Sequence, residues 1–210
     1  MKKKGFKYFV LIVVAGLLAY NSVYFKKLDA QKAQLNTALS PVDYAQKFWT
    51  RQFIAYLDSA VEINSFIKML KDDPTKTFQQ YAHTQGIGNI SFFLLKGEGT
   101  IQSVDENEVV VLAKAGTDEL AVKLITGLYF GNAVRDVTGH IKMDDFSNTR
   151  EFNIVSAELN KIVSKQVMVP FKAKAVKGAS VQFVGCAEIN KEQINTANFQ
   201  LLPVRINFSK

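Results

Sequence analysis

The chain has 210 residues, which is enough for one ordinary domain or two small ones with a buried core. Its 48% of hydrophobic residues is typical of a globular protein and excludes an intrinsically disordered one. The net charge of +7 arises at the N-terminus, where six lysines and no acidic residue precede residue 28. The remaining 20 basic and 19 acidic residues nearly cancel, so we expect no concentrated basic face and no nucleic-acid partner.

An apolar segment from Tyr8 to Phe25 lies between these lysines. Its eighteen residues would reach about 27 Å as a helix, close to the thickness of a bilayer core. Four lysines before it and two after it predict a cytoplasmic N-terminus and an exported body. A cleaved signal peptide has a similar pattern, but Leu17 and Ala19 make a poor cleavage site. We therefore expect a single-pass anchor in the bacterial inner membrane, with the body on the periplasmic side.

The region from residue 28 to residue 90 is predicted to be a small helical subdomain. Ser40 and Pro41 are typical of a helix start, because a hydroxyl caps the first turn and proline suits the first helical position. Apolar residues then recur at spacings of three and four: Val42, Ala45, Phe48, Trp49, Phe53, Tyr56 and Leu57. A second run follows from Ala60 to Leu70, and Asp73–Pro74 begins a third helix. We expect these aromatic side chains to form a core.

After residue 90 the pattern changes to the alternation that is typical of half-buried strands. The predicted strands are 90–104, 108–114, 119–130, 177–189 and 199–208. One helix lies between the third and the fourth strand, with Asn148 as its cap and Glu151 three residues later. This is the element order of an OB-type barrel. The predicted fold class is α+β: an anchor (1–27), a helical subdomain (28–90) and an OB-like five-stranded α/β barrel (91–210).

The segment Gly131–Phe152 concentrates most of the polar residues that could carry chemistry. It contains Arg135, Asp136, His140, Asp144, Asp145, Asn148, Arg150 and Glu151. No serine or cysteine has the setting of a catalytic nucleophile, and the two histidines and Cys186 are too scattered for a zinc site. We expect no metal, no cofactor and no catalytic residue. An alternative is a glycan hydrolase that uses Asp136, Asp144 or Asp145, but adjacent residues on an extended segment would point to opposite faces.

A structural interpretation accounts for most of this segment. The acidic residues and Asn148 suit the N-terminus of the following helix, where the macrodipole favours negative charge. Arg135 lies in a predicted strand-to-turn passage and suits either a buried carboxylate or a carboxylate ligand. Because Arg135 and Asp136 are adjacent, we expect them to reach different partners. The candidate ligand-binding residues are Arg135, Asp136, Asp145 and Asn148.

The sequence resembles the DUF2291 family of predicted periplasmic lipoproteins. The resemblance rests on KGEGTIQSV, GNAVRDVTGHIKMDDFSNTREFN, ELNKIV, VQFVGCAEI and LLPVRI, which occur in the family's order. It covers most of residues 40–208 and is strong from Lys96 onward. The resemblance implies a helical piece with an OB-like domain and a role beside sugar ABC transporters, but no established activity. Many members carry a lipobox cysteine, whereas the N-terminal segment here contains none.

These observations predict a membrane-tethered, non-enzymatic envelope protein. It would bind an envelope protein partner or a small-molecule ligand, as an accessory to a sugar ABC transport system. The hydrolase and a purely structural assembly protein are the alternatives. The identity of the ligand or partner and the oligomeric state do not follow from the sequence.

Overall fold

The computed structural model describes residues 39–209, except 87, 116–117 and 197–198, together with Tyr8, Val13 and Val14. Residues 39–210 form one compact unit. The predicted anchor lies outside the described residues, apart from those three positions. Within the described part of the chain, no helix has the length and apolar character needed to cross a bilayer.

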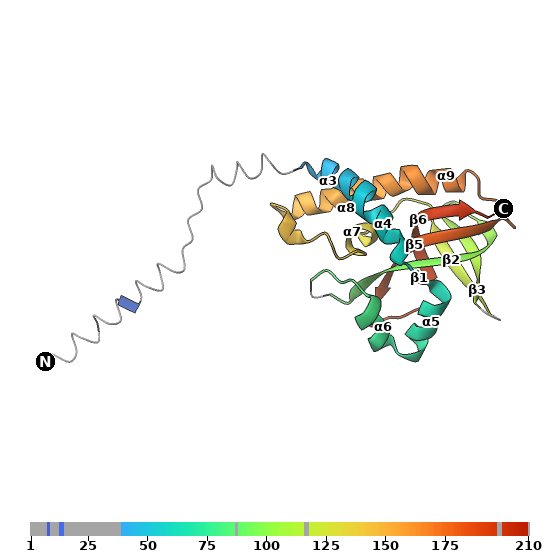
Figure 1. Cartoon of the computed structure of the whole chain (residues 1–210), viewed down its shortest axis with the longest axis horizontal. Helices are drawn as coiled ribbons and strands as arrows, with labels where there is room; N and C mark the ends of the chain where they lie inside the picture. Colours follow the sequence, from blue (N-terminus) through green and yellow to red (C-terminus); the bar gives the residue numbers. More distant parts are fainter. Residues whose placement is uncertain are drawn as a thin grey trace. The chain divides into compact units, whose positions relative to one another are not determined.

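The centre of this unit is a closed barrel. The strands are β1 (Val61–Glu62), β2 (Ile90–Val104), β3 (Glu108–Ala115), β4 (Asp118–Ile125), β5 (Ser180–Asn190) and β6 (Phe199–Phe208). Their order is β1-β2-β3-β4-β6-β5, and β5 also pairs with β2, so five strands close on themselves (Figure 1). The pairing of β4 with β6 is parallel and the other pairs in the barrel are antiparallel. The predicted OB-like barrel is therefore confirmed.

Strand β2 has two partners because it is long and curved. Residues 90–100 pair with β5, and residues 99–104 pair with β3. Gly99 lies where the two pairings meet, and a Cβ atom there would be 2.2 Å from the carbonyl oxygen of Leu112. Glycine permits this close approach of two backbones, which any side chain would prevent. The strand can therefore turn from one side of the barrel to the other.

The helices lie on two sides of the barrel (Figure 1). The first side holds α3 (Pro41–Phe48), η1 (Trp49–Phe53), α4 (Ile54–Tyr56), η2 (Leu57–Ser59), α7 (Ala133–Asp136), η3 (Met143–Asp145), α8 (Thr149–Val163), η4 (Ser164–Met168) and α9 (Val169–Lys172). The second holds α5 (Ile63–Asp72) and α6 (Pro74–Tyr81). The predicted caps at Ser40 and Asn148 are present and accept from the amides of Asp43 and Glu151. The predicted start of the third helix is also capped, by Asp73, which accepts from the amide of Lys76.

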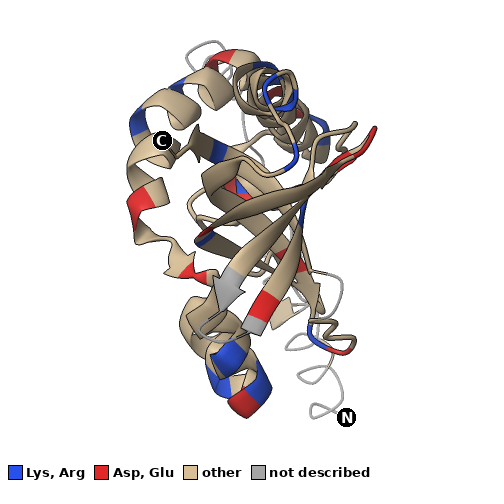
Figure 2. Cartoon of the chain, turned by 90° about the vertical axis from the view of Figure 1, so that its right-hand side faces the viewer, with Lys and Arg blue, Asp and Glu red and all other residues tan. Residues whose placement is uncertain are grey.

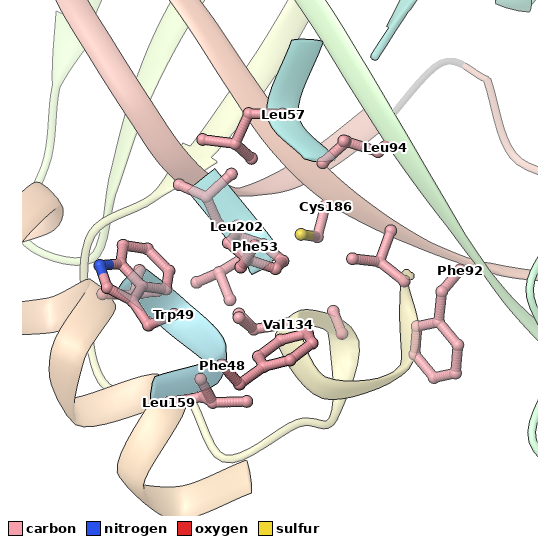
Figure 3. Close-up of a cluster of buried hydrophobic side chains, with 14 of the residues drawn as sticks. Phe48, Trp49, Phe53, Leu57, Phe92, Leu94, Val134, Leu159, Cys186 and Leu202 are labelled. Atoms are coloured by element: carbon pink, nitrogen blue, oxygen red, sulfur yellow. The ribbon is translucent and has the colours of Figure 1, made fainter. Parts of the chain in front are cut away.

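Two hydrophobic clusters form the core. In the first, α3 and η1 pack with α7 and α8 against one side of the barrel (Figure 3). Phe48, Trp49 and Phe53 belong to this cluster, and the indole of Trp49 stacks on the ring of Phe53 at 5.0 Å. The second cluster fills the barrel and extends to α5. The change from helices to strands near residue 90 thus does not separate two cores, because helical and barrel residues occur in both clusters.

The free thiol of Cys186 lies in the first cluster. Burial raises the pKa of this thiol well above its ordinary value, so the group is uncharged and unreactive there. Both basic and acidic residues are scattered along the ribbon in the view of Figure 2, in keeping with the nearly balanced charge of the body.

The third strand is shorter than the predicted 119–130. Strand β4 ends at Ile125, which pairs with Glu108, the first residue of β3. Beyond Ile125, β4 has no residue of β3 to pair with, because β3 begins at Glu108. The amides of Thr126 and Gly127 instead both donate to the carbonyl of Asn107, and the chain leaves the sheet.

Candidate functional site

The first half of the segment 131–152 is buried. Arg135 and Asp136 lie in the short helix α7, with side chains only 4% and 2% exposed. The guanidinium donates to the neighbouring carboxylate through two bonds, Nε to Oδ1 at 2.7 Å and Nη2 to Oδ2 at 2.9 Å. The prediction that these residues reach different partners was wrong. A folded-back arginine side chain is long enough to meet the adjacent carboxylate, and in a buried site neither charge has water as an alternative partner.

The same arginine also joins α7 to α8. Its guanidinium carbon lies 3.6 Å from the ring centre of Phe152, which is a close cation–π contact. Its Nη1 group donates to the carbonyl of Phe152 and to Oδ1 of Asn153, each at 3.4 Å. Arg135 therefore lies in a helix rather than in the predicted strand-to-turn passage, and its donors are directed at groups of the protein.

The second half of the segment is exposed and forms the start of α8. Asp144 and Asp145 lie in the single turn η3, not on the predicted extended segment. Asp145 accepts from the amide of Lys142 at 3.0 Å, and Asn148 accepts from that of Glu151 at 3.0 Å. The expected ligand residues are thus split into a buried pair, Arg135 and Asp136, and an exposed turn and helix cap. In the described part of the chain, no hydrogen bond joins the two groups.

Sequence reasoning missed a cluster around Tyr56. The hydroxyl of Tyr56 lies 3.0 Å from Nε2 of His83, and the ring of His140 packs edge-on against the tyrosine at 5.8 Å. A Cβ atom on Gly139 would be 2.7 Å from the His83 ring, so only glycine allows this approach. Burial and His140 lower the pKa of His83. The histidines are 57 positions apart in the sequence, and only the fold brings them together.

The most unusual surface of the unit is the loop that precedes α7, residues 127–132, which we call the display loop. Leu128 and Phe130 are each 87% exposed, more than any other large apolar side chain in the described residues. Tyr129 between them turns inward, where its hydroxyl lies 3.4 Å from Oε2 of Glu188 and from the amide of Ala133. Burial, reinforced by Glu188, raises the pKa of Tyr129.

The display loop is held against α8. Asn132 accepts from the hydroxyl of Ser156 at 2.8 Å, and the carbonyl of Gly131 accepts from Nδ2 of Asn160 at 2.9 Å. Gly131 lies flat on the Tyr129 side chain, where a Cβ atom would be 2.2 Å from the phenol oxygen. Leu128 and Phe130 are therefore exposed although these contacts hold the loop that carries them in place.

A cavity of about 520 Å³ opens between the display loop and α8. We call it the α8 hollow. One side is the display loop. The other is a face of α8 and η4 with the apolar Met168 and with small and polar residues at helical spacing: Asn153, Ser156, Ala157, Asn160, Lys161, Ser164 and Lys165. Its size is in the range of ligand and peptide sites. Asn153 belongs both to this wall and to the contacts of Arg135, so the buried pair supports the hollow from behind.

Two further hollows are lined mainly by polar side chains. One of about 540 Å³ crosses β2, β5 and β6 and has charges of both signs, Glu62, Glu98, Lys96 and Arg205. The other, of about 510 Å³, lies beside His83, Lys142 and Asp144. Within the described residues, no group of three or more His, Cys, Asp or Glu side chains could hold a metal ion. The α8 hollow differs from both because exposed apolar side chains border it.

The family model for DUF2291, described as a predicted periplasmic lipoprotein, matches residues 13–207. The chain belongs to the DUF2291 family. This description supports an envelope location. The segment from Gly131 to Phe152 lies within the matched residues, so the resemblance seen in the sequence is confirmed. No match was found among curated proteins.

A crystal structure of an OB-fold protein from Thermotoga maritima is similar to this chain, with a TM-score of 0.73 and 22% sequence identity. The similarity covers 82% of this chain and 100% of the other. At this identity the comparison shows the fold alone. It agrees with the closed five-stranded barrel and its intervening helix.

Proposed function

We propose that this DUF2291 protein is a non-enzymatic envelope protein that binds a protein partner through the display loop and the α8 hollow. The observation that carries the proposal is the exposure of Leu128 and Phe130, 87% each, beside a cavity. Two large apolar side chains kept in water contribute nothing to the stability of the isolated fold. Exposed apolar groups rimmed by polar ones are typical of interaction sites.

Two features of the display loop support the same proposal: buried polar atoms without a partner beside it, and its order before any partner binds. Thr126 Oγ1 and Asn160 Oδ1 are both buried without a hydrogen-bond partner in the described part of the chain. Thr126 precedes the loop, and Asn160 donates to the carbonyl of Gly131 within the loop. Within the protein, these two atoms therefore add nothing to the stability of the isolated fold. A loop that is ordered before binding loses less entropy when a partner arrives.

The membrane topology and the transport role are parts of the same proposal. We infer that residues 8–25 anchor the body at the periplasmic face of the inner membrane, since the flanking lysines and the poor cleavage site favour retention. An accessory role beside a sugar ABC transporter follows from the family resemblance. N-terminal sequencing of protein extracted from membranes tests the anchor: we expect Met1, and a start near Tyr20 would contradict it.

The binding function is tested by site-specific cross-linking in native membranes. Phe130 is replaced by a photo-reactive phenylalanine analogue in the full-length chain, and Val176 is replaced in a matched control. Val176 is also well exposed, at 62%, but lies in the turn before β5. We expect a discrete cross-linked product from position 130 alone, with one protein identified in it by mass spectrometry. No product, or the same products from both positions, would contradict the proposed function.

A further inference from the structure

We propose that the α8 hollow binds a short peptide segment that carries both apolar and acidic side chains. This inference rests on the proposed function and specifies the chemistry of the partner. The apolar part follows from the two side chains on the display loop. The acidic part follows from the charges on the opposite wall.

The shape of the hollow suits an extended or singly turned peptide. Ser156, Ala157 and Ser164 are small residues on one face of α8 and η4, so a backbone can approach the helix closely. Leu128 and Phe130 stand on the other side, two positions apart, with the inward Tyr129 between them. A peptide between these sides would place its apolar side chains against the loop. A volume of about 520 Å³ holds several side chains, not a whole domain.

The charges that line the hollow are all positive. Lys161 and Lys165 lie one helical turn apart on the wall, and no acidic residue lines the cavity. Lys161 forms an ion pair with Glu158 at 2.5 Å, which partly offsets its charge. Lys165 is exposed and has no ion pair within the described residues. Carboxylates on a bound segment would find their partners here, whereas lysines or arginines would be repelled.

The polar wall distinguishes a peptide from a lipid surface. Amides and hydroxyls of Asn132, Asn153, Ser156 and Ser164 line the cavity. Such groups can exchange hydrogen bonds with a peptide backbone. Asn132 and Ser156 bond to each other and Asn153 accepts from Arg135, but groups such as the Ser164 hydroxyl make no hydrogen bond within the described residues. Covering those groups with acyl chains would leave them unpaired, which costs free energy. The basic residues alone would also suit an anionic membrane, but this wall favours a peptide.

The test uses the full-length protein in detergent and a phage-displayed library of random twelve-residue peptides. Clones that also bind the Leu128→Ser/Phe130→Ser double variant are removed. We expect the remaining clones to be enriched in Asp and Glu together with Leu or Phe. Synthetic copies of these peptides are then measured by fluorescence polarisation. We expect affinity to fall at least tenfold with Phe130→Ser and several-fold with Lys165→Glu, but not with Lys177→Glu, an exposed lysine outside the hollow.

Other results would overturn the inference. Enrichment of basic or uncharged peptides, no enrichment, or equal effects of Lys165→Glu and Lys177→Glu would each do so. Binding to phosphatidylglycerol vesicles that requires Leu128 and Phe130, without any selected peptide, would assign the surface to the membrane. A specific cross-link from position 130 to a protein, combined with peptides that lack acidic residues, would overturn the peptide chemistry and leave the proposed function standing. Failure of the cross-link at position 130 would overturn the proposed function itself.

Discussion

The display loop and helix α7 are neighbours in the chain, and they reverse the usual distribution of side chains. In α7 an arginine and an aspartate are almost completely buried, whereas in the loop a leucine and a phenylalanine are almost completely exposed. Charged residues are rarely buried unless they are paired, and the pair here satisfies that condition. The charged residues of α7 therefore stabilise the fold, whereas the exposed apolar residues of the display loop are the better candidates for function.

The largest expected effect is on the buried side of this comparison. Arg135→Ala would leave the carboxylate of Asp136 buried without its partner and remove the contacts with α8. We expect the free energy of unfolding to fall by about 3–5 kcal/mol, measured by urea denaturation of the purified protein. Arg205→Ala is the matched control, because its ion pair with Asp58 is exposed and should contribute about 1 kcal/mol or less. A loss below about 0.5 kcal/mol for Arg135→Ala would mean that Arg135 has no architectural role.

The next largest effect on the free energy of unfolding is expected at Gly131, between the exposed residues of the display loop and α7. Gly131→Ala would place a methyl group on the Tyr129 hydroxyl, so the tyrosine and the display loop must move. We expect a loss of about 1–3 kcal/mol in the same denaturation experiment, as for other overpacked sites. Gly88→Ala is the control, since a Cβ atom there meets nothing closer than 3.9 Å. Equal effects of the two substitutions would show that the loop is not held by this contact.

A smaller effect is expected from the cluster around Tyr56. Because the pKa of His83 is lowered in the folded protein, the unfolded chain binds more protons below the ordinary histidine value of about 6.5. The contribution of His83 to stability is therefore complete above about pH 6.5 and is lost as the pH falls below it. We expect His83→Gln to reduce the difference in unfolding free energy between pH 7.5 and pH 5.5. The reduction should be below about 1 kcal/mol because the ring is partly exposed.

Other titratable groups near His83 are His140, Lys142, Asp144 and Tyr56. His140→Gln is the control for the electrostatic part, and it should raise the pKa of His83 because the effect of His140, which lowers that pKa, is removed. A pH dependence that His83→Gln leaves unchanged would show that other groups are responsible.

The smallest effect on stability is expected for the two exposed side chains of the display loop. Leu128→Ser and Phe130→Ser should each change the free energy of unfolding by less than about 0.5 kcal/mol, because these side chains are in contact with water in the folded chain. Leu128→Ser should also weaken the cross-link from position 130, and Phe130→Ser should weaken the binding of the selected peptides at least tenfold. A loss of several kcal/mol would instead indicate that the display loop packs within the fold.

Local pattern and chain order determined most of the architecture. The bounds predicted for 90–104 and 199–208 match β2 and β6. The expected wet face is missing along much of both strands, because consecutive residues such as Leu201 and Leu202 are buried in different clusters on the two faces. The helix caps at Ser40 and Asn148 were visible because a capping side chain lies within a few residues of the helix start that it serves. The order of five strands and one helix was sufficient for the OB-like barrel.

Only the tertiary structure decided the site, because its contacts join residues far apart in the chain. That β4 stops at Ile125 depends on where β3 begins, and this end of the strand creates the display loop. The exposure of Leu128 and Phe130 could not be predicted from the sequence. The apolar residues up to Phe130 there resemble a continuation of the preceding strand. The pairing of Arg135 with Asp136 depends on burial under Phe152, which excludes water from the two charges.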